Sequence, residues 1–156
     1  MSLTVDIKAE IRMKTVEQIL SERGLNKGGR VQMAIDRAVI KYCMPYVPKD
    51  TGVLESSPYA ASVIGSGKVV YPGPYARYLY YGEVMGPNIP VFEDDSGIPT
   101  RFFSPPGQKK HLTGRPLQYK QDLNPLAGSF WFNRMKADHA NDIVREARAV
   151  AGLEQY

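Results

Sequence analysis

The sequence is poor in the residues that build disulfides, metal sites and catalytic centres. Its 156 residues include a single cysteine, Cys43, so no internal disulfide can form. The only two histidines, His111 and His139, lack metal-ligand spacing, and no CxxC, HExxH or GxSxG pattern occurs. We expect Cys43 to be a buried thiol and His139 a half-buried packing residue. We therefore expect no catalytic residue, no cofactor, no metal and no small-molecule substrate, and hence no enzyme.

Long hydrophobic runs are also missing. No apolar segment approaches the roughly 20 residues that cross a bilayer. The first residues lack the charged and apolar regions of a signal peptide. The net charge of +4 is mild, whereas a dedicated nucleic-acid-binding protein usually concentrates more positive charge. We therefore expect a protein that folds in a cytoplasm and has no membrane partner.

Two segments have the patterns of β-structure. Residues 3–13 alternate strictly between apolar and polar side chains, which is typical of a strand with one buried face in an antiparallel or mixed sheet. An amphipathic helix is the alternative for this segment. Two short apolar runs flank Gly65-Ser66-Gly67 and predict a β-hairpin over residues 60–72.

Helical signals recur along the rest of the chain. Thr15 and Gln18 are spaced as a capping box, and Ser129 and Gly152 are placed to cap the last helix. Apolar residues at steps of three and four, or a proline start and a glycine stop, predict four helices. These cover about residues 15–23, 29–44, 74–81 and 130–151.

Residues 83–128 differ from the remainder because they hold seven of the twelve prolines and no sustained periodicity. A segment of this length without regular structure is usually functional or disordered. We expect a long irregular arm that becomes ordered against a neighbouring subunit. The predicted fold is α+β: a small antiparallel or mixed sheet packed by helices. The arm is inserted before the C-terminal helix of a single domain, residues 1–156.

Two short motifs resemble enzymatic signatures, but their flanking residues or spacing do not match those signatures. Asp50-Thr51-Gly52 is the triplet of aspartic proteases, but a hydrophobic strand should precede it, and here Val47-Pro48-Lys49 does. Pro-Lys-Asp-Thr-Gly is instead good turn chemistry. Gly65-Ser66-Gly67-Lys68 lacks the spacing of a phosphate-binding loop. Both motifs therefore predict turns.

A basic stretch and a group of aromatic residues are the candidate binding surfaces. No acidic residue occurs from Ser96 to Gln121. Phosphate could be contacted there, although a solvated loop or a contact with acidic Glu93-Asp94-Asp95 of a neighbour is the favoured interpretation. The candidate DNA contacts are Arg101, Lys109, Lys110 and Arg115.

Five tyrosines lie between Tyr71 and Tyr81, more than one small core needs. Tyr75, Tyr78 and Leu79 share one helix face and are expected to pack inside. Tyrosine is enriched at protein interfaces. The candidate subunit interface therefore comprises Tyr80 and Tyr81, together with Phe102 and Phe103 of the arm.

Four segments resemble landmarks of one family. Residues 48–54 are similar to the Pro-x-x-Thr-Gly-x-Leu signature of tailed-phage minor capsid proteins and neck or tail-completion proteins. Residues 75–82 resemble that family's Tyr-Ala helix ending in glycine, and residues 23–32 and 130–139 are similar to its opening and closing segments. Tyr80 and Glu55 depart from the wider tail-completion pattern, which often has glutamate and a basic residue there. The family-motif turn comprises Pro48, Asp50, Thr51, Gly52 and Leu54.

This resemblance implies a function that composition and periodicity do not. Such proteins are non-enzymatic virion components that form rings or partial rings at the head–tail junction. They contact connector proteins on one side and the tail on the other. The resemblance thus implies a homo-oligomer in the virion, assembled in the host cytoplasm, with phage connector and tail proteins as partners. The alternative is a nucleic-acid-binding module that contacts phage DNA through residues 101–120.

Overall fold

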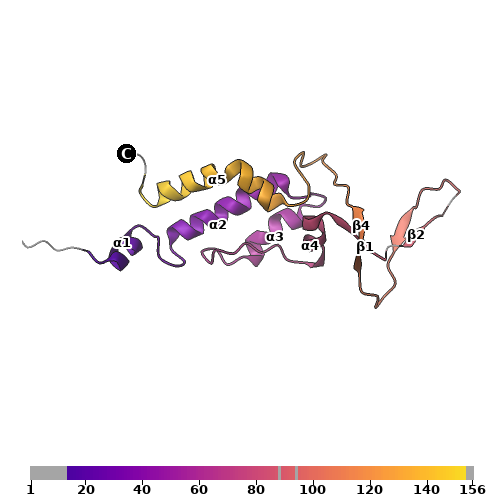
Figure 1. The fold of residues 1–156 in the computed structure, drawn as a ribbon, viewed down its shortest axis with the longest axis horizontal. Helices are drawn as coiled ribbons and strands as arrows, with labels where there is room; N and C mark the ends of the chain where they lie inside the picture. The colour runs from indigo at the N-terminus through magenta and orange to yellow at the C-terminus, as the bar shows by residue number, and fades with distance from the viewer. Residues whose placement is uncertain (1–13, 88, 94, 154–156) are drawn as a thin grey trace, which may run out of the picture.

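The molecule is elongated, with a helical body at one end and a β-structured arm at the other (Figure 1). The computed structural model describes residues 14–87, 89–93 and 95–153. The strand expected at residues 3–13 lies outside the described residues. Helices α1 to α4 come first along the chain, four short strands follow, and helix α5 comes last. The predicted α+β class is therefore confirmed.

Helix α1, Val16–Glu22, begins as its sequence predicts. The Thr15 hydroxyl accepts a hydrogen bond from the Gln18 amide, and the Gln18 side chain accepts one from the Thr15 amide. This reciprocal capping box satisfies two amides that a helix start would otherwise leave unpaired. None of the residues of α1 is buried, so the helix is held mainly by its ends.

The body is built on two long helices, α2 (Arg30–Cys43) and α5 (Trp131–Val150), which pack against each other more extensively than any other two helices. The short 3-10 helix η1, Met44–Tyr46, continues α2. The expected cap of α5, Ser129, is wrong. Phe130 occupies the cap position with a left-handed backbone, φ 49°, and no side-chain cap forms. The Phe130 amide donates to the Tyr80 carbonyl at 2.8 Å, which fixes this start against α4.

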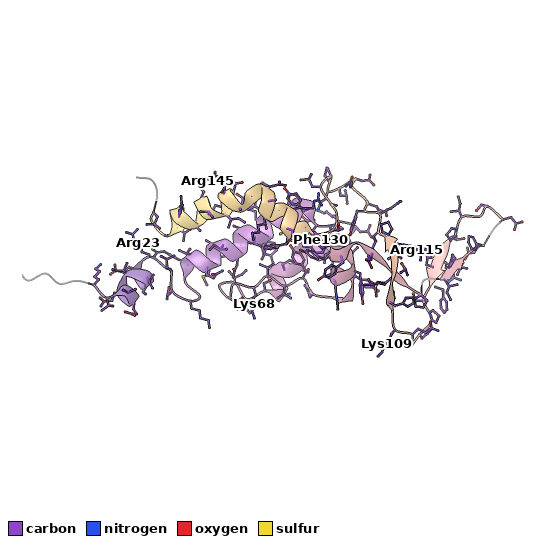
Figure 2. All side chains as sticks on the ribbon, viewed as in Figure 1. Arg23, Lys68, Lys109, Arg115, Phe130 and Arg145 are labelled. Carbon is purple, nitrogen blue, oxygen red and sulfur yellow. The ribbon has the colours of Figure 1, made fainter. Side chains whose placement is uncertain are left out.

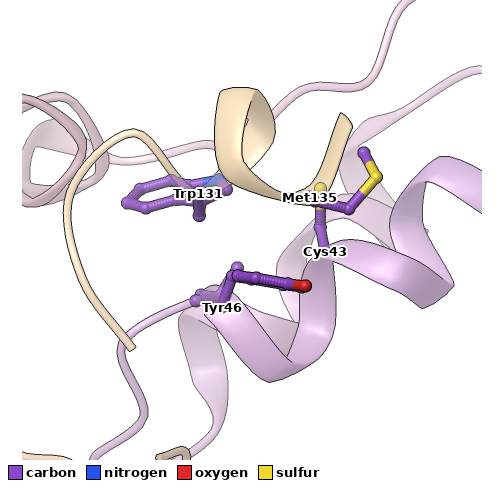
Figure 3. Close-up of a cluster of buried hydrophobic side chains, with 5 residues drawn as sticks. Cys43, Tyr46, Trp131 and Met135 are labelled. Carbon is purple, nitrogen blue, oxygen red and sulfur yellow. The ribbon is translucent and has the colours of Figure 1, made fainter. Parts of the chain in front are cut away.

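The core of the body lies where the end of α2 meets the start of α5 (Figure 3). It comprises Cys43, Tyr46, Val47, Trp131 and Met135, each at most 3% exposed. Complete burial of such side chains is worth about 1.5–3 kcal/mol each. Cys43 is therefore part of the hydrophobic core, as its sequence position predicts.

The β-hairpin expected over residues 60–72 is wrong. Residues 53–61 form helix α3, Val53–Ala61, and residues 62–73 form a loop without a strand. The two apolar runs are joined by one bond, from the Val70 amide to the Ser62 hydroxyl at 2.9 Å, instead of a strand ladder. The Gly65 and Gly67 amides donate to the buried Asp36 carboxylate of α2, at 2.7 and 3.2 Å. The loop is thus tied to a helix, and the sequence pattern carried no sign of that partner.

Helix α4, Pro74–Tyr81, starts at a proline and ends at Gly82, as expected. Gly82 has φ 76°, and a side chain there would approach the Ser129 Cβ to 3.0 Å. Its carbonyl accepts from the Leu117 amide at 2.8 Å, so the two ends of the arm meet at this glycine. The end of α4 therefore anchors the arm to the body.

The arm contains regular structure that its proline content did not predict. Strand β1 (Glu83–Gly86) pairs antiparallel with β4 (His111–Pro116), and β2 (Ile89–Val91) pairs antiparallel with β3 (Arg101–Phe103). The expectation of a wholly irregular arm was therefore incomplete. Antiparallel pairing is therefore present as two two-stranded ladders, but both lie in the arm and not in the segments where the sequence predicted strands.

Candidate assembly surfaces

The family-motif turn is the bent segment that connects η1 to α3. Gly52 has φ 83°, a conformation that favours glycine, and its carbonyl accepts from the Ser56 amide at 3.1 Å. Lys49 forms an ion pair with the nearly buried Glu55 at 2.9 Å. Leu54 packs against the core, which links this turn to the body.

The motif turn also faces the segment that returns from the arm. Pro48, Asp50, Thr51 and the neighbouring residues line a shallow hollow of about 330 Å³ together with residues 117–120. The Asn124 side-chain amide donates to the Met44 and Val47 carbonyls at 2.9 and 2.8 Å. The motif turn therefore lies where α3, the core and residues 117–120 meet. Nothing in this geometry brings a second carboxylate to Asp50.

The tyrosines of α4 divide between core and surface differently from the sequence prediction. Tyr80 packs edge-on against Trp131, with ring centroids 4.8 Å apart, and burial raises its pKa. Tyr75, expected to pack inside, is 67% exposed. Tyr81 is 54% exposed, in accord with a surface role. The reversal follows from the start of α5, whose Phe130 amide binds the Tyr80 carbonyl and draws Tyr80 inward.

A groove of about 570 Å³ opens on the body between α2, residues 67–73, α4 and the first turn of α5. Its lining is mainly apolar, with aromatic walls, and the exposed side chain of Arg77 also lines it. The aromatic residues in the lining are Tyr71, Tyr80, Tyr81, Trp131 and Phe132. We refer to this feature as the aromatic groove.

The carboxylate in the lining of the aromatic groove already has hydrogen-bond partners. Asp36 accepts from Gly65, Gly67 and the Gln32 side chain, the last at 2.8 Å. Burial raises the pKa of the Cys43 thiol to about 11, so the thiolate that would act as a nucleophile is scarce at neutral pH. The groove is therefore suited to apolar contact.

The outer part of the arm, residues 87 and 89–104 apart from the undescribed Asp94, carries most of its apolar side chains in solvent. We call it the arm tip. On a strand, neighbouring side chains point to opposite faces, and both Phe102 and Phe103 are exposed, 61% and 48%. Neither face of the β2–β3 ladder is thus covered by its own chain. Other exposed apolar residues in the tip are Ile89, Phe92 and Ile98.

The predicted DNA contacts lie on different elements of the arm. Arg101 lies on β3 and pairs with Glu93 at 3.5 Å. Lys109 and Arg115 are exposed in the arm, well away from Arg23 and Arg145 on the body (Figure 2).

The structure also adds a residue that sequence reasoning missed. Arg77 of α4, Lys110 and His111 line one hollow of about 490 Å³, together with Tyr78, Tyr81, Met85 and Leu112. The Lys110 ammonium lies 6.0 Å from the centre of the Tyr75 ring. Arg77 escaped notice because it lies on α4, well before the basic stretch in the sequence.

His139 is a packing residue, as predicted. Its ring stacks on Tyr42 with centroids 4.7 Å apart, and Nδ1 lies 2.9 Å from Asp142. Asp138 does not contact it and instead accepts from the Tyr46 hydroxyl at 2.6 Å. Within the part of the chain that the structure describes, no three His, Cys, Asp or Glu residues are grouped as a metal site.

These features define a class of protein before any comparison is made. A small helical body presents a structural turn, an aromatic groove and an arm with uncovered apolar side chains, which is the construction of an assembly subunit. Residues 7–96, more than half of the chain, match the family described as Minor capsid protein, and the chain belongs to that family. Searches of curated proteins and of solved structures give no match.

Family membership confirms the resemblance seen in the sequence and makes the protein a structural component of the virion. It also implies contact with other virion proteins and favours a non-enzymatic role. No described helix is both long and apolar enough to cross a bilayer. The match includes the motif turn, α4 and the first strands of the arm, whereas α5 lies beyond it.

Proposed function

We propose that this minor capsid protein is a head–tail joining subunit that assembles into a ring through contacts between identical copies. The observation that carries the proposal is the arm tip, whose apolar residues are exposed on both faces of its ladder. An isolated two-stranded ladder is marginally stable in water. Contiguous exposed apolar surface commonly marks a protein–protein contact. A neighbouring protein would supply the missing cover.

The two ends of the molecule favour an adaptor between different neighbours. The arm lies at one end, and α1 lies near the other (Figure 1). Val16, Ile19 and Leu20 of α1 are all exposed, so this end also presents apolar side chains without a cover. A joint between head and tail must bind connector proteins on one side and tail proteins on the other. Uncovered apolar surface at both ends supports that arrangement.

The test is the solution mass of the purified protein, alone and mixed with the connector and tail-tube proteins encoded beside it. We expect a species that becomes a ring when those partners are present. Phe102→Ser/Phe103→Ser should abolish the ring, since it removes the apolar face that a neighbour would cover. Leu123→Ser is the matched control because Leu123 is 61% exposed, like Phe102, and lies outside the arm tip. A small oligomer that ignores the partners would contradict the proposal.

A second candidate function is DNA contact, favoured by the hollow that Arg77, Lys110 and His111 share. No carboxylate lines this hollow, so a phosphate would meet only positive or neutral groups. Lys109→Glu/Lys110→Glu should remove salt-sensitive DNA affinity if this function holds. Lys27→Glu/Lys68→Glu changes the net charge equally at exposed sites on the body. If the arm variant loses DNA binding while particles assemble normally, the arm serves DNA and not assembly.

A further inference from the structure

We propose that the aromatic groove of one subunit receives the arm tip of a second copy of the chain. The inference rests on the proposed ring and names the surface that accepts the arm. It makes each subunit a donor through its arm and an acceptor through its body.

The groove has the size and chemistry for apolar side chains. Its volume of about 570 Å³ falls within the range of about 300–1,000 Å³ typical of ligand pockets. Tyr71, Tyr80 and Trp131 form a wall in which rings meet edge-on, with centroids 4.8 and 5.4 Å apart. Such a wall favours further aromatic partners, because rings gain energy from offset and edge contacts. Phenylalanine side chains from the arm tip would supply them.

The arm tip has the complementary surface. Phe102, Phe103 and Ile89 are each at least 48% exposed, and their strands make extensive contacts only with each other among the described elements. Phe103 pairs with Ile89 across the ladder, so these two side chains form one apolar face. A two-stranded ladder with so small an apolar face is marginally stable by itself, so it gains from a partner surface.

Charge also matches between the two surfaces. Arg77 is exposed in the lining of the groove, and no described carboxylate lies within ion-pair distance of it. The arm tip carries two exposed carboxylates in its turn, Asp95 and Glu93, the second of which pairs with Arg101 of the same tip. A carboxylate of the incoming tip would therefore meet an unpaired guanidinium, which favours this register and orientation. The same charges oppose an approach by another basic segment of the arm.

The geometry makes the contact head-to-tail. The arm extends away from the helical body (Figure 1), so an arm tip seated in the groove would come from a second copy of the chain. Donor and acceptor are different surfaces of one chain, which is a heterologous contact. Such contacts close into rings when the rotation between subunits permits.

Thiol cross-linking tests this contact. The cysteines are placed at exposed positions, where a substitution should not disturb the fold. Phe103→Cys marks the donor and Tyr81→Cys marks the acceptor, at 48% and 54% exposure. Cys43 stays, since it is 1% exposed and its burial keeps the thiol protonated. A chain carrying both changes should give a ladder of covalent oligomers on non-reducing gels, with and without the connector and tail-tube proteins.

Mixing single variants makes the test directional. Chains with only Phe103→Cys and chains with only Tyr81→Cys should join into a heterodimer and stop there, because each has one reactive surface. Leu123→Cys combined with Tyr81→Cys is the control for random collision. Its cross-linking should be at least about tenfold slower, as expected when no contact raises the effective concentration of the thiols.

The outcomes separate this inference from the proposed function. If the unmodified protein forms rings but donor and acceptor thiols react no faster than the control pair, the groove is not the receiver, while the ring proposal stands. If the groove thiol instead links to a connector or tail protein, the occupant is that partner and the inference is wrong. If the protein neither forms rings nor cross-links, both proposals fail.

Discussion

Large apolar side chains are buried in the core of the helical body and exposed in the β-structured arm. The body buries Trp131, Met135 and Ile40 almost completely. The arm holds three of the chain's five phenylalanines, and each is about half exposed or more. The difference lies in the elements, because two long helices can enclose a core and a two-stranded ladder cannot. The core of the body is therefore covered by its own chain, whereas the arm is the part for which we propose a neighbour as cover.

The largest effect on stability should come from the core of the body. Met135→Ala removes a side chain that is fully buried and leaves a cavity between α2 and α5. We expect the free energy of unfolding to fall by about 2–5 kcal/mol, measured by urea denaturation. Val144→Ala is the control on the same helix, since Val144 is 47% exposed, and it should change stability by about 0.5 kcal/mol or less. Equal effects at the two positions would mean that the described core is wrong.

A smaller loss of stability should follow when the loop at residues 62–73 is released from α2. Asp36→Ala leaves the amides of Gly65 and Gly67 without their carboxylate partner. We expect the free energy of unfolding to fall by about 1–3 kcal/mol, since hydrogen bonds to charged groups are stronger than those between neutral groups. Hydrogen exchange at these two amides should accelerate more than exchange in α5. Asp36→Asn keeps one acceptor oxygen and should fall between Asp36→Ala and the unchanged protein.

The same contrast explains which elements the sequence could predict. The helices of the body have local signals: the capping box at Thr15, the apolar stripe of α2, and the Pro74 and Gly82 boundaries of α4. The loop at residues 62–73 has no such signal, because its conformation depends on Asp36, distant in the sequence. The start of α5 at Phe130 likewise depends on the Tyr80 carbonyl and not on a local cap.

The candidate binding surfaces could be predicted only in part, because they too depend on contacts between segments that are distant in the sequence. Phe102, Phe103 and Tyr81 are exposed, as an interface requires, because their neighbours in sequence leave them no core to join. Tyr80 is half-buried and Arg77 joins the basic hollow, and both depend on how α4 meets distant segments. Residue type indicated which side chains could bind a partner. Tertiary packing determined which of them remain available.

A modest pH effect should arise on the body. Hydrogen bonds from Lys41 and Tyr42 hold the pKa of Glu146 below its ordinary value, and His139 and Arg145 lower the pKa of Asp142. A lowered folded pKa adds stability above the ordinary carboxyl pKa of about 4, and that stability is lost as the pH falls further. The melting temperature should therefore drop between about pH 5 and about pH 3. Glu146→Gln/Asp142→Asn should flatten that drop, and an unchanged profile would exclude these two groups as its cause.

The smallest effect on stability should accompany the largest effect on assembly. Phe102→Ser/Phe103→Ser removes side chains that touch solvent, so the free energy of unfolding should change by about 0.5 kcal/mol or less. Ring formation should nevertheless be lost, because the apolar face that a neighbour covers is gone. Calorimetry and solution mass on the same sample measure both quantities. A variant that unfolds several kelvin earlier would show that the phenylalanines already support their own chain, and the difference between self-covered body and neighbour-covered arm would no longer hold.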